Sequence, residues 1–184
     1  MKKLTIGYKI AIGFAIILSM FVIVSVITLR NQNNLAENAD WVTHTHQVIT
    51  VIEGISGSLK DAETGQRGYI ITGVDEYLEP YKDALKSIDS ELVELKQLTS
   101  DNAEMQQNII ELKGLINKKL EELDQTINLR KNKGFQTAQE VVITNHGKIV
   151  MDQIRGVLNE MTSIYSGGYF SAIFKLKQDL LQGA

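Results

Sequence analysis

The chain has 184 residues, which is enough for one domain and a membrane anchor, and its formal net charge is −3. That charge gives no electrostatic reason to expect nucleic acid as a partner. One proline and no cysteine suit a mostly helical protein, and they exclude a disulfide or thiolate–metal framework.

The first apolar stretch predicts a transmembrane helix. Residues 10–29 carry no charged side chain and match the roughly 20 residues that cross a hydrocarbon core as a helix. Three lysines lie in residues 1–9 without an acidic residue, so the positive-inside rule places this segment in the cytoplasm and the chain after Arg30 outside. A cleaved signal peptide is less favoured, because its apolar region spans only about 7–15 residues. We therefore expect a single-pass protein of the cell (inner) membrane.

Beyond the anchor, apolar residues recur with the spacing of a coiled coil. Leu35, Val42 and Ile49 are separated by seven residues, and Ile52 and Leu59 fill the alternate seam position. This pattern predicts that the membrane helix continues outward as a long first helix. It also favours a dimer.

The three histidines raise the question of a metal site, since imidazole is the commonest metal ligand. His44 and His46 are two residues apart and do not share a helix face. His146 lies far along the sequence, and no cysteine or His-x-x-x-His pair supports zinc. We expect histidines that face solvent or lie between helices, with no metal ion and no cofactor.

Residues 61–73 form the most unusual stretch and read Asp-Ala-Glu-Thr-Gly-Gln-Arg-Gly-Tyr-Ile-Ile-Thr-Gly. Glu63 and Arg67 are four residues apart, in the acid-first order that favours a helical ion pair. Gly65 and Gly68 each cost a helix interior about 1 kcal/mol relative to alanine, so their presence needs a reason. Gly73 predicts the end of the helix in the left-handed conformation that glycine tolerates.

Two interpretations of this stretch stay open. In the structural one, Gly65, Gly68 and Gly73 permit close helix packing beside one ion pair. In the functional one, a small polar pocket is lined by Glu63, Gln66 and Arg67. The candidate ligand-binding or signalling residues are then Asp61, Glu63, Thr64, Gln66 and Arg67. Acid–base catalysis by Asp61 and Glu63 is not expected, because residues two apart on a helix diverge.

The rest of the chain predicts three further amphipathic helices. The first runs from about Glu79 to Thr99, with Asp75 as a possible cap and Pro80 in its first turn. The second opens at an acidic capping box, Asp101 and Glu104, and ends in a basic turn at Gly134. The third runs from Phe135 to Met161 and falters at residues 145–147. Short connections between helices are typical of a bundle.

We therefore predict an all-α protein, with residues 30–165 as an extracytoplasmic four-helix bundle whose first helix is continuous with the transmembrane span. Residues 166–184 form an atypical tail. Residues 161–174 are uncharged but too short to span a membrane, and Gly167-Gly168 is expected to break any helix there. Residues 175–182 could form only a short amphipathic helix.

Residues 61–69, followed by Thr72-Gly73 and by Tyr77–Tyr81, resemble the signature of the third type of CHASE domain. The likeness extends from about Trp41 to Met161. It implies an extracellular helical sensory module of membrane histidine kinases, cyclases or chemoreceptors, dimeric in most members and without a well-established ligand. The family normally continues into a second membrane span and an output module, and we expect neither from residues 162–184.

No phosphate loop, kinase signature or nucleophilic triad is present, so we expect no enzyme. The expected function is a sensory input domain anchored in the lipid bilayer. It would respond to a small molecule or an envelope stress by a change in helix packing, and it would act through a partner, either a second copy or a receptor. The alternative is a membrane-tethered helical scaffold or an inactive truncated receptor.

Overall fold

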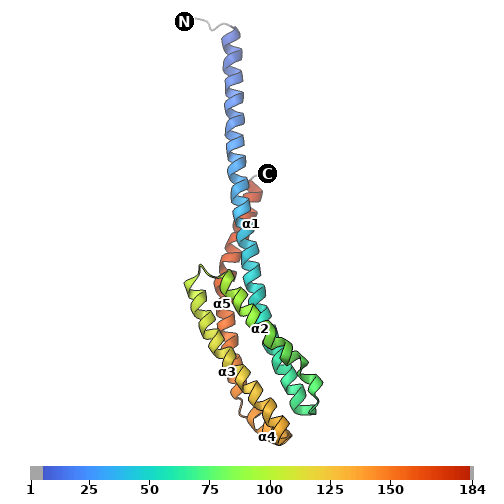
Figure 1. Ribbon diagram of the computed structural model, residues 1–184. Helices are drawn as coiled ribbons and strands as arrows, with labels where there is room; N and C mark the ends of the chain where they lie inside the picture. The colour runs from blue at the N-terminus through green and yellow to red at the C-terminus, as the bar shows by residue number, and fades with distance from the viewer. Residues whose placement is uncertain (1–5, 183–184) are drawn as a thin grey trace. The chain divides into compact units, whose positions relative to one another are not determined.

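The computed structural model describes the backbone of residues 6–182 and the side chains of residues 6–7, 12–29 and 39–167. The elements in chain order are α1 (Ile6–Thr72), the 3-10 helix η1 (Asp75–Leu78), α2 (Glu79–Leu98), α3 (Ala103–Lys133), α4 (Phe135–Val142) and α5 (His146–Gln182), as Figure 1 shows. No strand occurs among the described residues, so the predicted all-α fold is confirmed. The chain divides into two compact units, His44–Gly168 and a second that combines Met1–Thr43 with Tyr169–Ala184.

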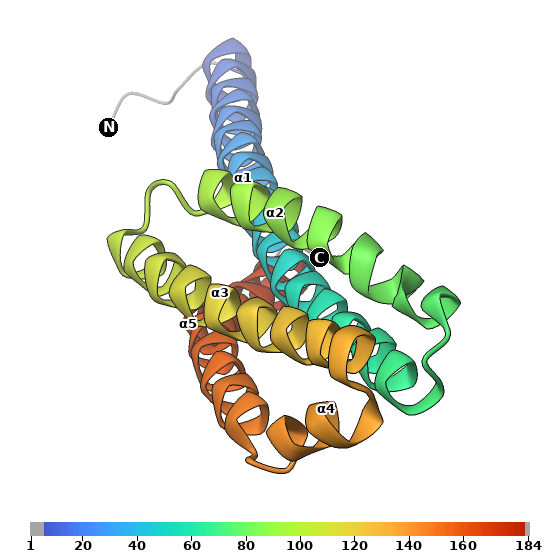
Figure 2. The same cartoon turned by 60° about the horizontal axis from the view of Figure 1, so that its bottom comes forward.

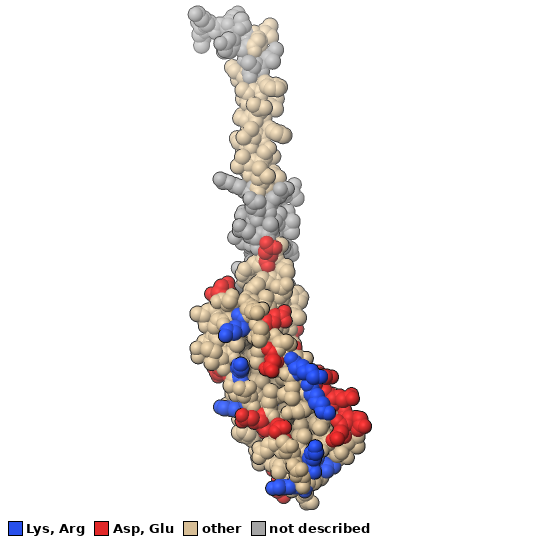
Figure 3. Space-filling view, in the orientation of Figure 1, with Lys and Arg blue, Asp and Glu red and all other residues tan. Residues whose placement is uncertain are grey.

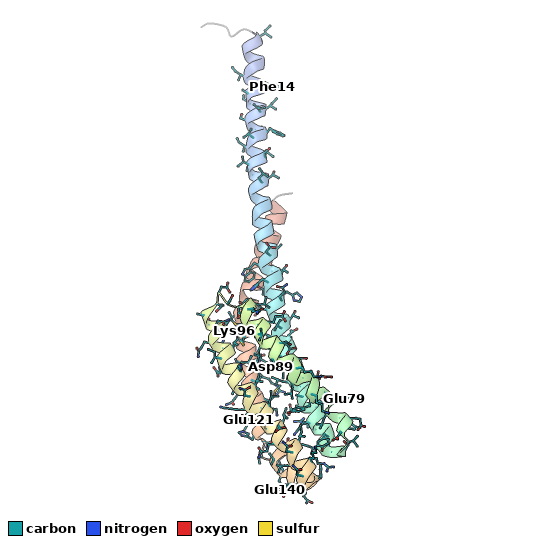
Figure 4. The ribbon with its side chains drawn as sticks, in the orientation of Figure 1. Phe14, Glu79, Asp89, Lys96, Glu121 and Glu140 are labelled. Atoms are coloured by element: carbon teal, nitrogen blue, oxygen red, sulfur yellow. The ribbon has the colours of Figure 1, made fainter. Side chains whose placement is uncertain are left out.

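The second unit contains the apolar segment Ile12–Leu29 of α1, which is long and apolar enough to cross a membrane; the described residues hold one such helix. None of this segment is buried, and Phe14 is 69% exposed. In Figure 3 the segment carries no Lys, Arg, Asp or Glu, and Figure 4 labels Phe14 on its surface. A fully exposed apolar helix is suited to lipid rather than to water.

The first unit, His44–Gly168, is a four-helix bundle, here called the bundle. One face of each of α1, α2, α3 and α5 contributes to a single apolar core, and Figure 2 shows the four segments around it. The largest fully buried apolar side chains are Ile55, Leu59, Ile88, Leu95, Met105, Leu112, Ile116, Leu123, Met151, Ile154 and Met161. Each contributes about 1.5–3 kcal/mol relative to an exposed side chain.

Two residues of the predicted dimer seam belong to this core. Ile52 is 2% exposed and Leu59 is fully buried, both among the side chains of the same bundle. Their heptad-like spacing is therefore explained by packing within one chain, because a bundle core and a coiled-coil seam follow nearly the same period. The side chain of Leu35 lies outside the described residues, as do those of Lys9 and Arg30.

Glycine ends two of the helices as predicted. Gly73 (φ 73°) donates its N–H to the Tyr69 carbonyl at 2.7 Å, and Gly134 (φ 88°) donates to the Arg130 carbonyl at 3.2 Å. The left-handed φ at both positions favours a residue without a side chain. Pro80 lies in the first turn of α2, also as predicted.

The predicted capping residue was wrong at the start of two helices. The N-cap of α3 is Asn102, whose Oδ1 accepts the Met105 N–H at 3.1 Å. Asp101 is one residue too early, because a capping side chain reaches the N–H two or three residues after it. Asp75 lies inside η1, whose N-cap position is Val74 and has no side-chain cap.

The end of the bundle departs from prediction in two further places. The predicted last helix, from Phe135 to Met161, is two helices in the structure, α4 and α5. They are separated where Asn145 takes a left-handed φ of 60°. The expected break at Gly167-Gly168 was wrong, because α5 continues through both glycines to Gln182. A glycine costs about 1 kcal/mol in a helix interior, which is too little to interrupt a helix of 37 residues.

Gly65 marks a close approach of α1 to the start of α2. A β-carbon at Gly65 would lie 2.9 Å from the Tyr77 carbonyl oxygen and 3.0 Å from the Tyr81 amide nitrogen, both backbone atoms. At Gly68 the nearest atom to a β-carbon would be Cδ1 of the Tyr77 ring, at 2.7 Å. The crossing therefore depends on the missing side chain at Gly65 most of all, since the backbone of another helix cannot move as a side chain can.

We predict that Gly65→Ala destabilises the bundle by about 1–3 kcal/mol, the usual cost of overpacking, although alanine is the better helix former. Gly57→Ala and Gly114→Ala are matched controls, because a β-carbon at either helical position would meet no atom within 4 Å. These two changes should stabilise by about 0.5–1 kcal/mol. Thermal unfolding of the full chain in mild detergent measures all three, and equal stabilisation by all of them would contradict the close crossing.

Candidate functional site

A buried lysine on α3 lies at the centre of the site. Lys119 is 2% exposed, and its amine donates to Glu122 Oε2 at 2.9 Å and to the Gly147 carbonyl oxygen at 3.3 Å. Glu63 Oε1 lies 3.7 Å from the same nitrogen. Since an unpaired charge in a protein interior costs several kcal/mol, these partners from α1, α3 and α5 are what permits the burial.

The predicted ion pair on α1 belongs to the same cluster. Arg67 Nη2 donates to Glu63 Oε1 at 2.7 Å, so Glu63 is shared between Arg67 and Lys119. We call Glu63, Arg67, Lys119 and Glu122 the charge network. Beside it, Gln66 is 2% exposed and donates to the Thr126 hydroxyl at 2.5 Å, which adds a polar contact between α1 and α3.

The start of α5 fits closely against this network. A β-carbon at Gly147 would lie 2.7 Å from Glu122 Cδ and 2.8 Å from Lys119 Nζ. The positive end of a helix dipole favours a carboxylate at an N-terminus, which is where Glu122 lies relative to α5. Gly147 therefore allows the N-terminus of α5 to contact both charged groups.

The charge network forms one wall of a polar cavity of about 140 Å³. We call this the polar pocket; its lining residues are Glu63, Gln66, Arg67, Lys119, Glu122, Val142, Asn145, Gly147 and Lys148. A second cavity of about 240 Å³, the apolar pocket, is lined by Arg67, Ile70, Ile71, Phe135, Gln139 and Val142. The two pockets share Arg67 and Val142. Glu140 of α4, labelled in Figure 4, marks this end of the bundle.

The structure brings together three of the five predicted site residues. Glu63, Gln66 and Arg67 line the polar pocket. Asp61 and Thr64 are exposed and do not line it. Gly65 and Gly68 of the structural interpretation face η1 and the start of α2, whereas the three residues named first line the polar pocket. A ligand-binding role for those three stays a prediction.

Several residues of the site were missed from the sequence. Lys119 and Glu122 were overlooked, although the spacing of Lys119 from Ile116 and Leu123, three and four residues, places it on the apolar face of α3. Gly147 was predicted only as part of the helix interruption at residues 145–147, and its contact with Lys119 was not foreseen. The contact of Arg130 with α1 was also missed. Arg130 lies in the basic last turn of α3, and its Nε donates at 2.7 Å to the Ile70 carbonyl oxygen near the end of α1.

The histidines lie between helices or face solvent, away from one another. His44 Nε2 is 2.8 Å from the Leu98 carbonyl oxygen, and its ring centroid is 6.0 Å from that of Tyr165. His46 is exposed and contacts Thr50 on its own helix, and His146 is exposed at the start of α5. Within the part of the chain that the structure describes, no three metal-binding side chains cluster.

A further carboxylate, Glu91, lies between α2 and α1 and lines neither pocket. Its Oε1 accepts the Ser58 hydroxyl at 3.1 Å, and a β-carbon at Gly54 would lie 2.9 Å from the same oxygen. Burial raises the pKa of Glu91, the Ser58 hydrogen bond opposes this shift, and Glu94 adds to it. Its raised pKa follows from the packing of α2 against α1.

Comparison with known families decides the identity of this bundle. Residues 38–166 match the family profile of the CHASE3 domain. The chain belongs to the CHASE3 family. Its CHASE3 domain covers nearly all of the bundle, and the resemblance read from the signature at residues 61–69 is thereby confirmed. CHASE3 domains are sensory domains, so the bundle is an input module.

One solved structure supports the fold. The sensor domain of the histidine kinase HK9 of Rhodopseudomonas palustris is similar, with 21% sequence identity and a TM-score of 0.63. The likeness covers 68% of this chain and 98% of that domain. No curated protein matches this chain.

Proposed function

We propose that the CHASE3 domain is the extracytoplasmic, non-catalytic input domain of a membrane signal-transduction protein. Three observations support this: the family, the apolar helix Ile12–Leu29, and the lysines of residues 1–9, which favour a cytoplasmic N-terminus. On this topology the bundle faces the periplasm or the exterior, and α1 crosses the inner membrane once.

In the proposed mechanism, the charge network couples the packing of three helices. Lys119 holds groups from α1, α3 and α5 within 4 Å of one nitrogen, so a change in its surroundings alters the contacts of three helices together. A ligand or an envelope stress shifts such packing only if it favours one arrangement over another. We propose that this shift at the polar pocket is the signal that the bundle transmits.

We further propose that the output passes through a partner polypeptide, either a second copy of this chain or a receptor. A cavity of about 430 Å³ lies between α2 and α3, beside Val93 (57% exposed) and Ile110 (67% exposed). Exposed apolar side chains around a groove are typical of protein contact surfaces. This groove supports a helix-to-helix contact outside the bundle core.

The mechanism is tested by placing residues 38–166 in a membrane histidine kinase in exchange for its own sensor domain. Lys119→Met removes the shared charge at similar side-chain volume. We expect the reporter output of the chimera to change by about fivefold or more, the lower range of allosteric coupling. Lys118→Met, an exposed neighbour on the same helix, is the matched control and should leave the output unchanged.

Equal output from the two variants, with equal amounts of each chimera in the membrane, would contradict signalling through the network. It would favour the alternative of a helical scaffold. A loss of membrane-inserted protein confined to Lys119→Met is detected by immunoblot and is corrected by expressing output per molecule.

Single cysteines test topology and partner together, because the chain has no native cysteine. Val93→Cys should react in intact cells with a maleimide that does not cross the inner membrane, and it should crosslink to a second copy or a receptor. Asp83→Cys, at an exposed position on the same helix, is the control for crosslinking. Labelling only after lysis would contradict the outward orientation, and equal crosslinking at both positions would contradict the α2–α3 groove as the contact.

A further inference from the structure

The polar and apolar pockets meet at two side chains. Arg67 and Val142 line both cavities, so the two cavities are neighbours. We propose that one ligand spans both pockets and that it is a small organic anion: a monocarboxylate attached to an apolar body about the size of one six-membered ring. This proposal rests on the proposed sensory function and specifies the chemistry of its stimulus.

The charges of the polar pocket favour an anion. Its lining holds three cationic side chains (Arg67, Lys119 and Lys148) and two carboxylates (Glu63 and Glu122), which leaves one positive charge. The Lys119 amine donates to Glu122 and to the Gly147 carbonyl, and Glu63 lies 3.7 Å away as a further opposite charge. Lys148 makes no ion pair within the described residues. Its charge is therefore available to a ligand.

Arg67 has the geometry to orient the carboxylate. Among the described residues its one side-chain hydrogen bond joins Nη2 to Glu63, at 2.7 Å, and its side chain is 62% exposed. A guanidinium carries five N–H donors in a planar fork that matches a carboxylate. Because Arg67 lines both cavities, a carboxylate bound to it lies where the apolar body of the ligand enters the second pocket.

The apolar pocket sets the size of that body. It has a volume of about 240 Å³, and its walls include Ile70, Ile71, Phe135 and Val142. A protein cavity of about 150 Å³ lined by such side chains accommodates benzene. The apolar pocket therefore has room for one ring and a short linker. Ile71 is 71% exposed and Phe135 is 43% exposed, and a ligand body would remove part of this apolar surface from water.

Other ligand classes fit less well. An inorganic anion would leave the apolar walls without a partner, and a neutral apolar molecule would leave the positive charge unmatched. A zwitterion would bring an ammonium group into a pocket whose lining already has one excess positive charge. The anion with an apolar body is the class that uses both pockets.

The test is calorimetric titration of the full chain in nanodiscs of zwitterionic lipid with 3-phenylpropionate. We expect saturable one-to-one binding. The neutral analogue 3-phenylpropanol and acetate, which has no ring, should each bind about tenfold more weakly or worse, because each lacks one of the two contacts. The zwitterion phenylalanine keeps both contacts but adds an ammonium group to a pocket that already has a net positive charge, so it should also bind more weakly.

Substitutions of residues that line the two pockets test whether 3-phenylpropionate binds there. Arg67→Gln should weaken 3-phenylpropionate binding by about tenfold or more, whereas Arg155→Gln, which removes a comparable exposed ion-pairing arginine on α5, should not. Phe135→Ala should weaken binding as well, with Ile110→Ala, an exposed position outside both pockets, as its control. Thermal unfolding of each variant shows that the bundle remains folded.

Absence of binding to wild type would overturn the proposal, and so would equal affinity for acetate or for 3-phenylpropanol. The result of this binding experiment can be distinguished from the result of the chimera experiment that tests the proposed function. If 3-phenylpropionate fails to bind while Lys119→Met still changes the chimera's output, only the ligand class is wrong. If it binds as expected while the output is unaffected by Lys119→Met, only the signalling mechanism is wrong.

Discussion

The burial of one ammonium group determines the arrangement of the site. Lys119 is 2% exposed, and the desolvation of its charge costs several kcal/mol unless opposite charge and hydrogen-bond acceptors surround it. Glu122, the Gly147 carbonyl and Glu63 supply them from three helices. The positions of α1, α3 and the start of α5 at this end of the bundle are therefore coupled through a single nitrogen atom.

Small residues make these contacts possible. Gly147 lets the start of α5 reach Lys119 and Glu122, and Gly65 lets α1 approach the backbone at Tyr77. Elsewhere the bundle is held by an ordinary apolar core, in which side chains such as Leu95 and Ile154 are fully buried. The polar coupling and the adjoining pockets thus lie at one end of the bundle, where residues of α1, α3, α4 and α5 line them.

The sequence allowed the parts of the fold that depend on local spacing to be predicted. The helix ends at Gly73 and Gly134 and the Glu63–Arg67 pair follow from residue types within one helical turn. The contact of Lys119 with Gly147 joins positions far apart in the chain, and no local pattern encodes it. The spacing of Ile52 and Leu59 favours a dimer seam and a bundle core alike, because the two have almost the same period, and the structure places both residues in the core of one chain.

The coupling of helices through Lys119 can be measured by hydrogen exchange on the full chain in nanodiscs, comparing Lys119→Met with Lys118→Met. The amides of residues 61–72 and 146–151 should exchange faster in Lys119→Met alone, because both segments lose their shared partner. The opposite end of the bundle, where His44 contacts Leu98, should be unchanged. Equal exchange in the two variants, or a uniform increase throughout the bundle, would contradict the account.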